Sequence, residues 1–178
     1  MKDLKQFNIP FIGLKEKSHL FEYQIDKTFF DAFNFDEFFN ANVQIQLTLN
    51  KKSTMLQLTF DAKGTVNVTC DVSGEPFDLE IDATLPLIIK FGEEFNDDNE
   101  EIIILPHSDF QFNVAQYIYE LIVLNVPIKR VHPQVLDGTM ESEAVKKLDK
   151  LRVIKEKTTE DVDPRWDKLK SLITEKKT

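Results

Sequence analysis

The feature that most constrains the fold is a strict alternation of apolar and polar residues between positions 43 and 87. The alternation occurs in four runs, at residues 43–49, 56–60, 66–70 and 77–87. It is typical of β-strands that bury one face and expose the other to water. The short connections at 61–64 and 71–76 predict sequential antiparallel pairing. We therefore predict a four-stranded meander, extended by neighbouring strands and strongly curled or barrel-like around its apolar side.

A helix is predicted after the meander. Asn113 suits the N-terminal cap, and Gln116 three residues later would complete a capping box. Apolar residues then recur at helical spacing until Pro127, and they cover much of the circumference. We expect this helix to pack centrally across the sheet, which makes the fold class α+β.

Shorter segments complete the predicted core. Residues 20–25 alternate imperfectly and predict an N-terminal strand, and residues 102–105 predict a buried strand that ends at Pro106. The aromatic stretch at 29–39 favours core packing over a cofactor site, because Phe offers no polar group to orient a ligand. The acidic loop at 92–101 has carboxylates for a hard cation, but a solvated loop is the favoured interpretation.

The C-terminal part has a different character. Residues 1–131 are predicted to form the sheet-and-helix domain, and the polar segment 132–162 is predicted to be a flexible linker. Residues 163–178 would then form a short helix and tail. Asp163 suits the cap and Pro164 the first helical position, and an apolar stripe that contains the only tryptophan follows them.

Charge is distributed unevenly along the 178 residues. The net charge is −9, made up of −12 in residues 1–127, here called the acidic body, and +3 in residues 128–178. The acidic body is a poor match for nucleic acid, since phosphate binding requires Lys and Arg to displace counterions. A basic protein partner would suit it, although a merely solvated acidic surface explains the same composition.

The cysteine count and the apolar runs limit the cellular setting. Cys70 is the only cysteine, which excludes an intramolecular disulfide and a multi-cysteine zinc site. The N-terminus lacks the apolar core of a signal peptide, and no apolar run is long enough to cross a membrane. These features predict a cytoplasmic protein without a membrane partner.

The sequence offers little chemistry for catalysis. His19, His107 and His132 show no metal-ligand spacing, and five glycines leave little room for a phosphate-binding loop. Three carboxylates alternate along residues 78–82, where solubility explains them better than acid–base work. We predict no catalytic residue, no metal, no cofactor and no small-molecule substrate.

Three landmarks in a fixed order carry a family resemblance. They are the turn segment Val68–Pro76, the helix segment Phe112–Pro127 and the closing segment Asp163–Leu169. In this order they resemble the YceD-like family of large ribosomal RNA subunit accumulation proteins, in a form similar to that of the Bacteroidetes. The resemblance implies a non-enzymatic bacterial protein of the cytosol that supports accumulation of the large-subunit ribosomal RNA.

The cysteines depart from the family pattern. Typical members carry Cys-x-x-Cys at the strand turn, whereas this chain has Cys70 followed by Ser73. Members often carry further cysteines after the helix-ending proline, where this chain has Val131, His132 and Pro133. The resemblance therefore does not carry a metal or redox role over to this chain.

The resemblance implies ribosomal RNA or a basic ribosomal protein as the partner. An interaction module without RNA contact is the alternative. We expect the contacts to come from cationic residues near and beyond the central helix and from the tryptophan, namely Lys129, Arg130, Arg165, Trp166, Lys168 and Lys170. Trp166 could stack on a base, but docking on the protein's own sheet is the favoured interpretation.

Overall fold

The computed structural model describes residues 4–99 and 102–151. The chain divides into two units, Met1–Val145 and Lys146–Thr178. In chain order the elements are η1 (Leu4–Phe7), β1 (Asn8–Pro10), β2 (Ser18–Asp26), α1 (Lys27–Ala32), β3 (Asn40–Lys51), β4 (Met55–Thr69), β5 (Pro76–Gly92), β6 (Asn96–Asn99), β7 (Ile102–Pro106), β8 (Gln111–Asn113), α2 (Ala115–Asn125), α3 (Pro133–Leu136) and α4 (Glu143–Leu151).

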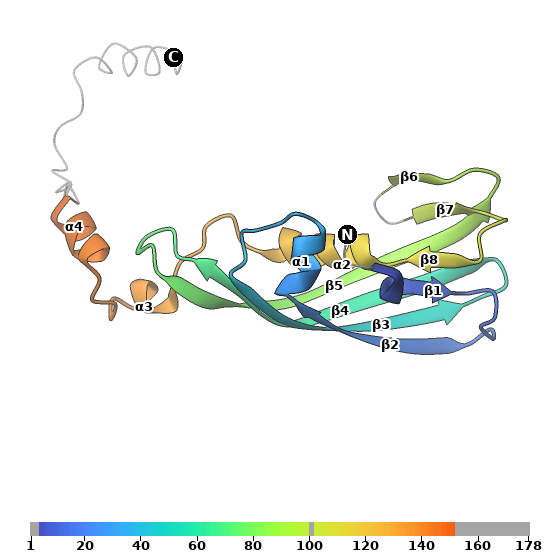
Figure 1. The fold of residues 1–178 in the computed structure, drawn as a ribbon, viewed down its shortest axis with the longest axis horizontal. Helices are drawn as coiled ribbons and strands as arrows, with labels where there is room; N and C mark the ends of the chain where they lie inside the picture. The colour runs from blue at the N-terminus through green and yellow to red at the C-terminus, as the bar shows by residue number, and fades with distance from the viewer. Residues whose placement is uncertain (1–3, 100–101, 152–178) are drawn as a thin grey trace, which may run out of the picture. The chain divides into compact units, whose positions relative to one another are not determined.

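A six-stranded sheet organises the first unit (Figure 1). Its strand order is β2-β3-β4-β5-β7-β6, and the pairs from β2 to β5 are antiparallel between sequential neighbours. The antiparallel meander is confirmed, but the four alternating runs form three strands, because the runs at 56–60 and 66–70 both belong largely to β4. The pairing of β5 with β7 is parallel, which the sequence did not predict. A second, two-stranded sheet pairs β1 with β8.

The predicted turn at residues 61–64 is wrong. The chain continues through it as the single strand β4, and Gly64 lies opposite Val43 on one side and Ile81 on the other. Ala62 is fully buried, so the alternation of the flanking runs passes through this point without a change of phase. Small residues here allow close backbone approach within a strand.

The barrel-like, strongly curled sheet is also wrong. The sheet is open, with β2 and β6 as its two edges and no pairing between them. Beyond β5 the sheet continues with β7, which is parallel to β5, and then with β6, which pairs antiparallel with β7. The sheet therefore ends at β6 and does not return to β2. The apolar side is covered instead by a layer of short elements and α2 (Figure 1). The fold class remains α+β with mostly antiparallel strands.

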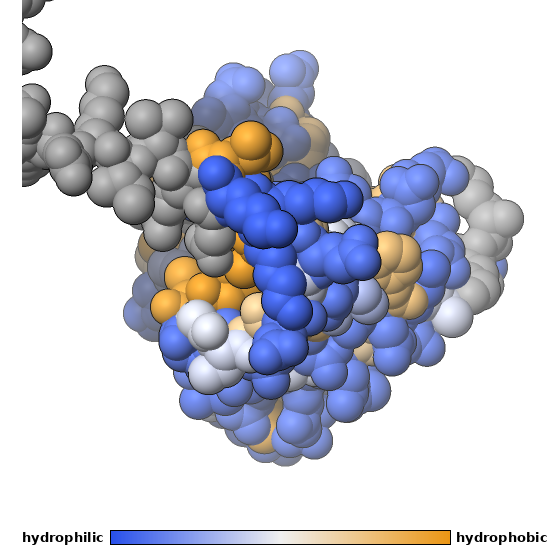
Figure 2. Space-filling view, turned by 90° about the vertical axis from the view of Figure 1, so that its left-hand side faces the viewer, coloured by the Kyte–Doolittle hydropathy of each residue, from blue (hydrophilic) through white to orange (hydrophobic). Residues whose placement is uncertain are grey.

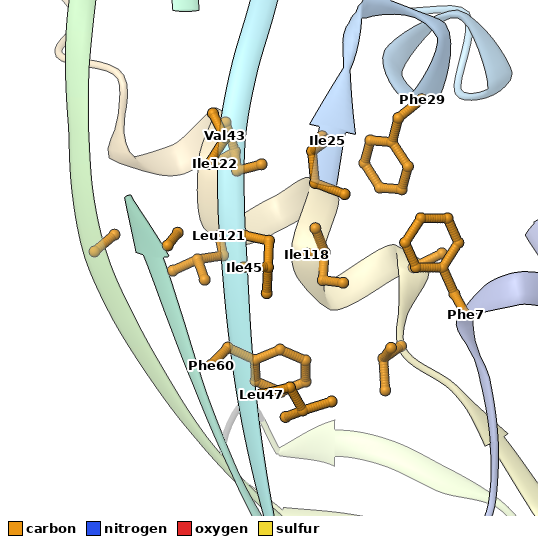
Figure 3. Close-up of a cluster of buried hydrophobic side chains, with 14 of the residues drawn as sticks. Phe7, Ile25, Phe29, Val43, Ile45, Leu47, Phe60, Ile118, Leu121 and Ile122 are labelled. Carbon is orange, nitrogen blue, oxygen red and sulfur yellow. The ribbon is translucent and has the colours of Figure 1, made fainter. Parts of the chain in front are cut away.

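The core lies between the sheet and α2 (Figure 3). Ile45 and Phe60 from the sheet face Ile118 from α2, and all three are fully buried. The aromatic stretch contributes as predicted: Phe30 packs edge-on against Phe38 with ring centroids 4.9 Å apart. Such aromatic pairs add about 1 kcal/mol to the burial of their apolar area.

Helix α2 starts differently from the prediction. It begins at Ala115, whose backbone N–H donates to the Asn113 side-chain oxygen at 2.9 Å. The side-chain amide of Gln116 does not close a capping box but donates to Glu120 one turn further on, at 2.6 Å. The Asn113 amide also donates to the Leu4 carbonyl at 3.1 Å, which ties the start of α2 to the N-terminal segment.

The predicted linker and closing helix are described only in part. Within residues 132–162, the described residues form α3 and α4. The start of α4 is capped by Ser142, whose hydroxyl accepts a hydrogen bond from the Val145 N–H at 3.2 Å. Residues 152–178, with the predicted closing helix, lie outside the described residues. The proposed domain boundaries stay predictions.

Candidate partner-binding surface

The segment that follows α2 is fixed to the turn after β4. Asp71 donates its backbone N–H to the Arg130 carbonyl at 2.8 Å, and its carboxylate accepts from the Arg130 N–H at 2.6 Å. The Cys70 sulfur accepts from the backbone N–H groups of Ser73, at 3.4 Å, and of His132, at 3.3 Å. We call this set of contacts the Cys70 clasp. It brings together the two segments in which the family resemblance predicts cysteines.

The clasp alters the acidity of the Cys70 thiol. The side chain is 1% exposed, and burial opposes ionisation. Hydrogen bonds to the sulfur from Ser73 and from the His132 backbone outweigh that effect and lower the pKa of Cys70 to about 7. Within residues 4–99 and 102–151, no three His, Cys, Asp or Glu side chains are grouped to hold a metal ion. In the clasp the sulfur accepts hydrogen bonds from two backbone N–H groups.

Arg130 is engaged within the fold. Its guanidinium lies 3.2 Å from a carboxylate oxygen of Glu37 and 3.7 Å from one of Asp71, and the side chain is 24% exposed. Lys129 is exposed, and Ile128 beside it is fully exposed. The remaining predicted contact residues lie outside the described part of the chain: Arg165, Trp166, Lys168 and Lys170. The predicted RNA contact stays a prediction.

A groove of about 650 Å³ lies along α2, on the side of β5, β6 and β7. We call it the α2 groove. Its apolar residues are Leu85, Ile103, Tyr117, Leu121 and Leu124. Its polar residues are Asp97, Gln116, Glu120 and Asn125. None of these nine residues is basic, and Leu124 is 81% exposed. The groove thus combines an apolar floor with carboxylates at its margin.

Tyr117 reports the electrostatic character of the α2 groove. Burial and the nearby negative charges of Asp97 and Glu120 raise the pKa of its phenol to about 12. The same carboxylates that disfavour a phenolate would disfavour any anion placed in the groove and would favour a cation. The groove is therefore suited to a ligand with apolar and positively charged groups.

The sequence did not predict the α2 groove. Asp97 belongs to the loop interpreted as solvated, but residues 96–99 form β6 and pair with β7. The available signal was the width of the apolar surface on α2. Leu121 is 7% exposed and completes the core, whereas Leu124 one turn on is left largely open. Figure 2 shows one face of the molecule, where hydrophobic residues gather in limited areas of a mostly hydrophilic surface.

Comparison with known proteins identifies the family. The family model described as large ribosomal RNA subunit accumulation protein YceD matches residues 58–173. The chain belongs to the YceD family. The matched span runs from within β4 through β5 and α2 to the C-terminal segment, so it includes the whole α2 groove and the Cys70 clasp. No curated protein and no solved structure was found to match. Among the described helices, none has both the length and the apolar character to cross a membrane.

Proposed function

We propose that this YceD-family protein is a non-enzymatic cytoplasmic factor that supports accumulation of the large-subunit ribosomal RNA. The observation that carries the proposal is the family match over residues 58–173. The α2 groove described above agrees with a binding role.

Depletion of the protein in its native cell tests this function. We expect the ratio of large-subunit to small-subunit ribosomal RNA to fall, and re-expression of the wild-type chain to restore it. Total RNA synthesis, measured by pulse labelling, is the control, because a general loss of transcription would lower both RNAs together. An unchanged ratio after full depletion would refute the proposal.

Direct contact with RNA is one way to perform this function. It would use Lys129 together with the cationic residues and tryptophan of the C-terminal segment: Arg165, Trp166, Lys168 and Lys170. Arg130 is less suited, because its charge is already balanced by Glu37 and Asp71. Isolated protein should then bind large-subunit ribosomal RNA, and the affinity should fall steeply as salt rises.

A protein adaptor without RNA contact is the second candidate. The charge of the acidic body, −12, and the carboxylates of the α2 groove favour it. Affinity purification with and without ribonuclease separates the two. Ribosomal proteins that remain bound after RNA digestion support the adaptor, and loss of all ribosomal components supports direct RNA contact.

A further inference from the structure

We infer that the α2 groove binds a cationic, amphipathic segment of a protein partner. The first argument is shape and polarity. Leu124 is 81% exposed, although it lies in the same groove as the buried Ile103 and Leu121. A partner segment with apolar residues at i, i+3 and i+4 would cover Leu124 and continue the apolar contacts of the floor.

The second argument is charge. Asp97 and Glu120 line the groove, and none of the other lining residues is basic. Both carboxylates act on Tyr117, which lines the same groove. Lys or Arg residues on the polar face of an amphipathic segment would lie beside these carboxylates, whereas the phosphates of RNA would be repelled.

The third argument concerns the source of the cations. The C-terminal residues 128–178 contribute a net charge of only +3 against −12 in the acidic body. The whole chain therefore keeps a net charge of −9, which attracts a basic partner and repels an anionic one. The biological setting of this partner rests on the proposed function, but its binding chemistry can be tested independently of ribosomal RNA levels.

The test uses the full chain and three fluorescent probes of similar size. One is a synthetic peptide with Leu at i, i+3, i+4 and i+7 and Lys at the remaining positions. The second replaces each Lys by Glu, and the third is a single-stranded RNA oligonucleotide. Fluorescence anisotropy at low salt should show binding of the Lys peptide and none of the Glu peptide.

Two groove variants and two matched controls locate the site. The double variant Asp97→Lys/Glu120→Lys should weaken binding of the Lys peptide by at least about tenfold, and Leu124→Ser by about fivefold. Glu22→Lys/Glu80→Lys and Leu20→Ser make the same changes of charge and polarity on the opposite face of the sheet, at exposed positions, and should change affinity less than twofold. Circular dichroism confirms that each variant is folded.

Four results would overturn the inference. The first is failure of the wild-type chain to bind the Lys peptide, and the second is equal weakening by groove and control variants. The third is tighter binding of the peptide to a chain with Trp166→Ala and Leu169→Ala, which would assign the groove to the chain's own closing segment. RNA binding that is lost with the groove variants would assign the groove to RNA instead. Peptide binding that persists while depletion leaves the RNA ratio unchanged would refute the proposed function and not the groove.

Discussion

The close approach of β3 to β4 at Gly64 allows the strand pairing to be tested by one methyl group. Gly64 has a φ of +154°, a conformation that L side chains rarely adopt. A Cβ added there would clash with the Asn42 carbonyl oxygen and lie 2.7 Å from the Val43 Cα. Because both atoms belong to the backbone, no side-chain rotation can relieve the clash. The strands would have to separate or bend at a central position of the sheet.

The expected cost of Gly64→Ala combines two effects. Backbone strain at such a position is of the order of 1–3 kcal/mol, and overpacking against a fixed neighbour adds about 1–3 kcal/mol. We therefore expect the free energy of unfolding to fall by roughly 3–5 kcal/mol. For a protein of this size the melting temperature should fall by about 10 °C.

Urea denaturation followed by circular dichroism measures the effect. Gly13→Ala is the matched control, because an added Cβ at Gly13 meets no atom within 4 Å. The control should change the free energy of unfolding by less than about 0.5 kcal/mol. A Gly64→Ala protein as stable as the control would refute the continuous β4 strand and favour a turn at residues 61–64.

Four further variants test contacts around α2 and the Cys70 clasp. Asn113→Ala should lower the free energy of unfolding by about 1–2 kcal/mol in urea titrations, because it removes the bond to the Ala115 N–H along with others. Arg130→Ala should cost about 1 kcal/mol and Lys129→Ala almost nothing, and equal costs would contradict the ion pairs of Arg130. The pKa of Cys70 is about 7 in the folded protein, against an ordinary value of 9.0. The lowered pKa therefore stabilises the folded state fully above pH 9, and this contribution is lost as the pH falls through 7. The advantage of wild type over Cys70→Ala should therefore grow by up to about 2 kcal/mol from pH 7 to 9, and a constant difference would contradict the clasp.

The local pattern was sufficient for most strands and for α2. Alternation identified β3, β4 and β5 because each buries one face against the same core. It failed at Gly64, where residues 61–64 are of types common in turns although buried Ala62 and Val66 keep the alternation unbroken. The stronger signal is that the apolar residues stay at even-numbered positions on both sides of residues 61–64. A continuous strand must keep this alternation, whereas a turn need not.

Closure of the sheet could not be predicted from local pattern. Whether the edges of a meander meet depends on what the next strand pairs with, and Ile102–Pro106 pairs parallel with β5 after a short hairpin. The residue pattern of a five-residue strand does not indicate which other strand it pairs with. The same limit applies to the α2 groove, which requires Leu85, Asp97 and Leu124 to meet from three separate elements.

The predicted role of Arg130 shows a related limit. In the sequence it stands beside Lys129 and the two look equivalent, yet one is bound to Glu37, 93 residues earlier in the chain, and the other is exposed. Only the tertiary structure separates a cation that stabilises the fold from a cation that is available to a partner.

This separation gives the salt dependence of RNA binding a specific meaning. For single-stranded RNA, each neutralised phosphate contributes a slope of about −0.7 to the logarithm of affinity against the logarithm of salt concentration. Contact through Lys129 alone would give a slope near −0.7, because Arg130 is already paired. Participation of Arg165, Lys168 and Lys170 would bring the slope to about −3. A steep slope that is unchanged by Arg130→Ala but becomes shallow when these three residues are replaced would assign RNA contact to the C-terminal segment. A flat slope in the wild type would instead favour the acidic body and its groove as the binding surface.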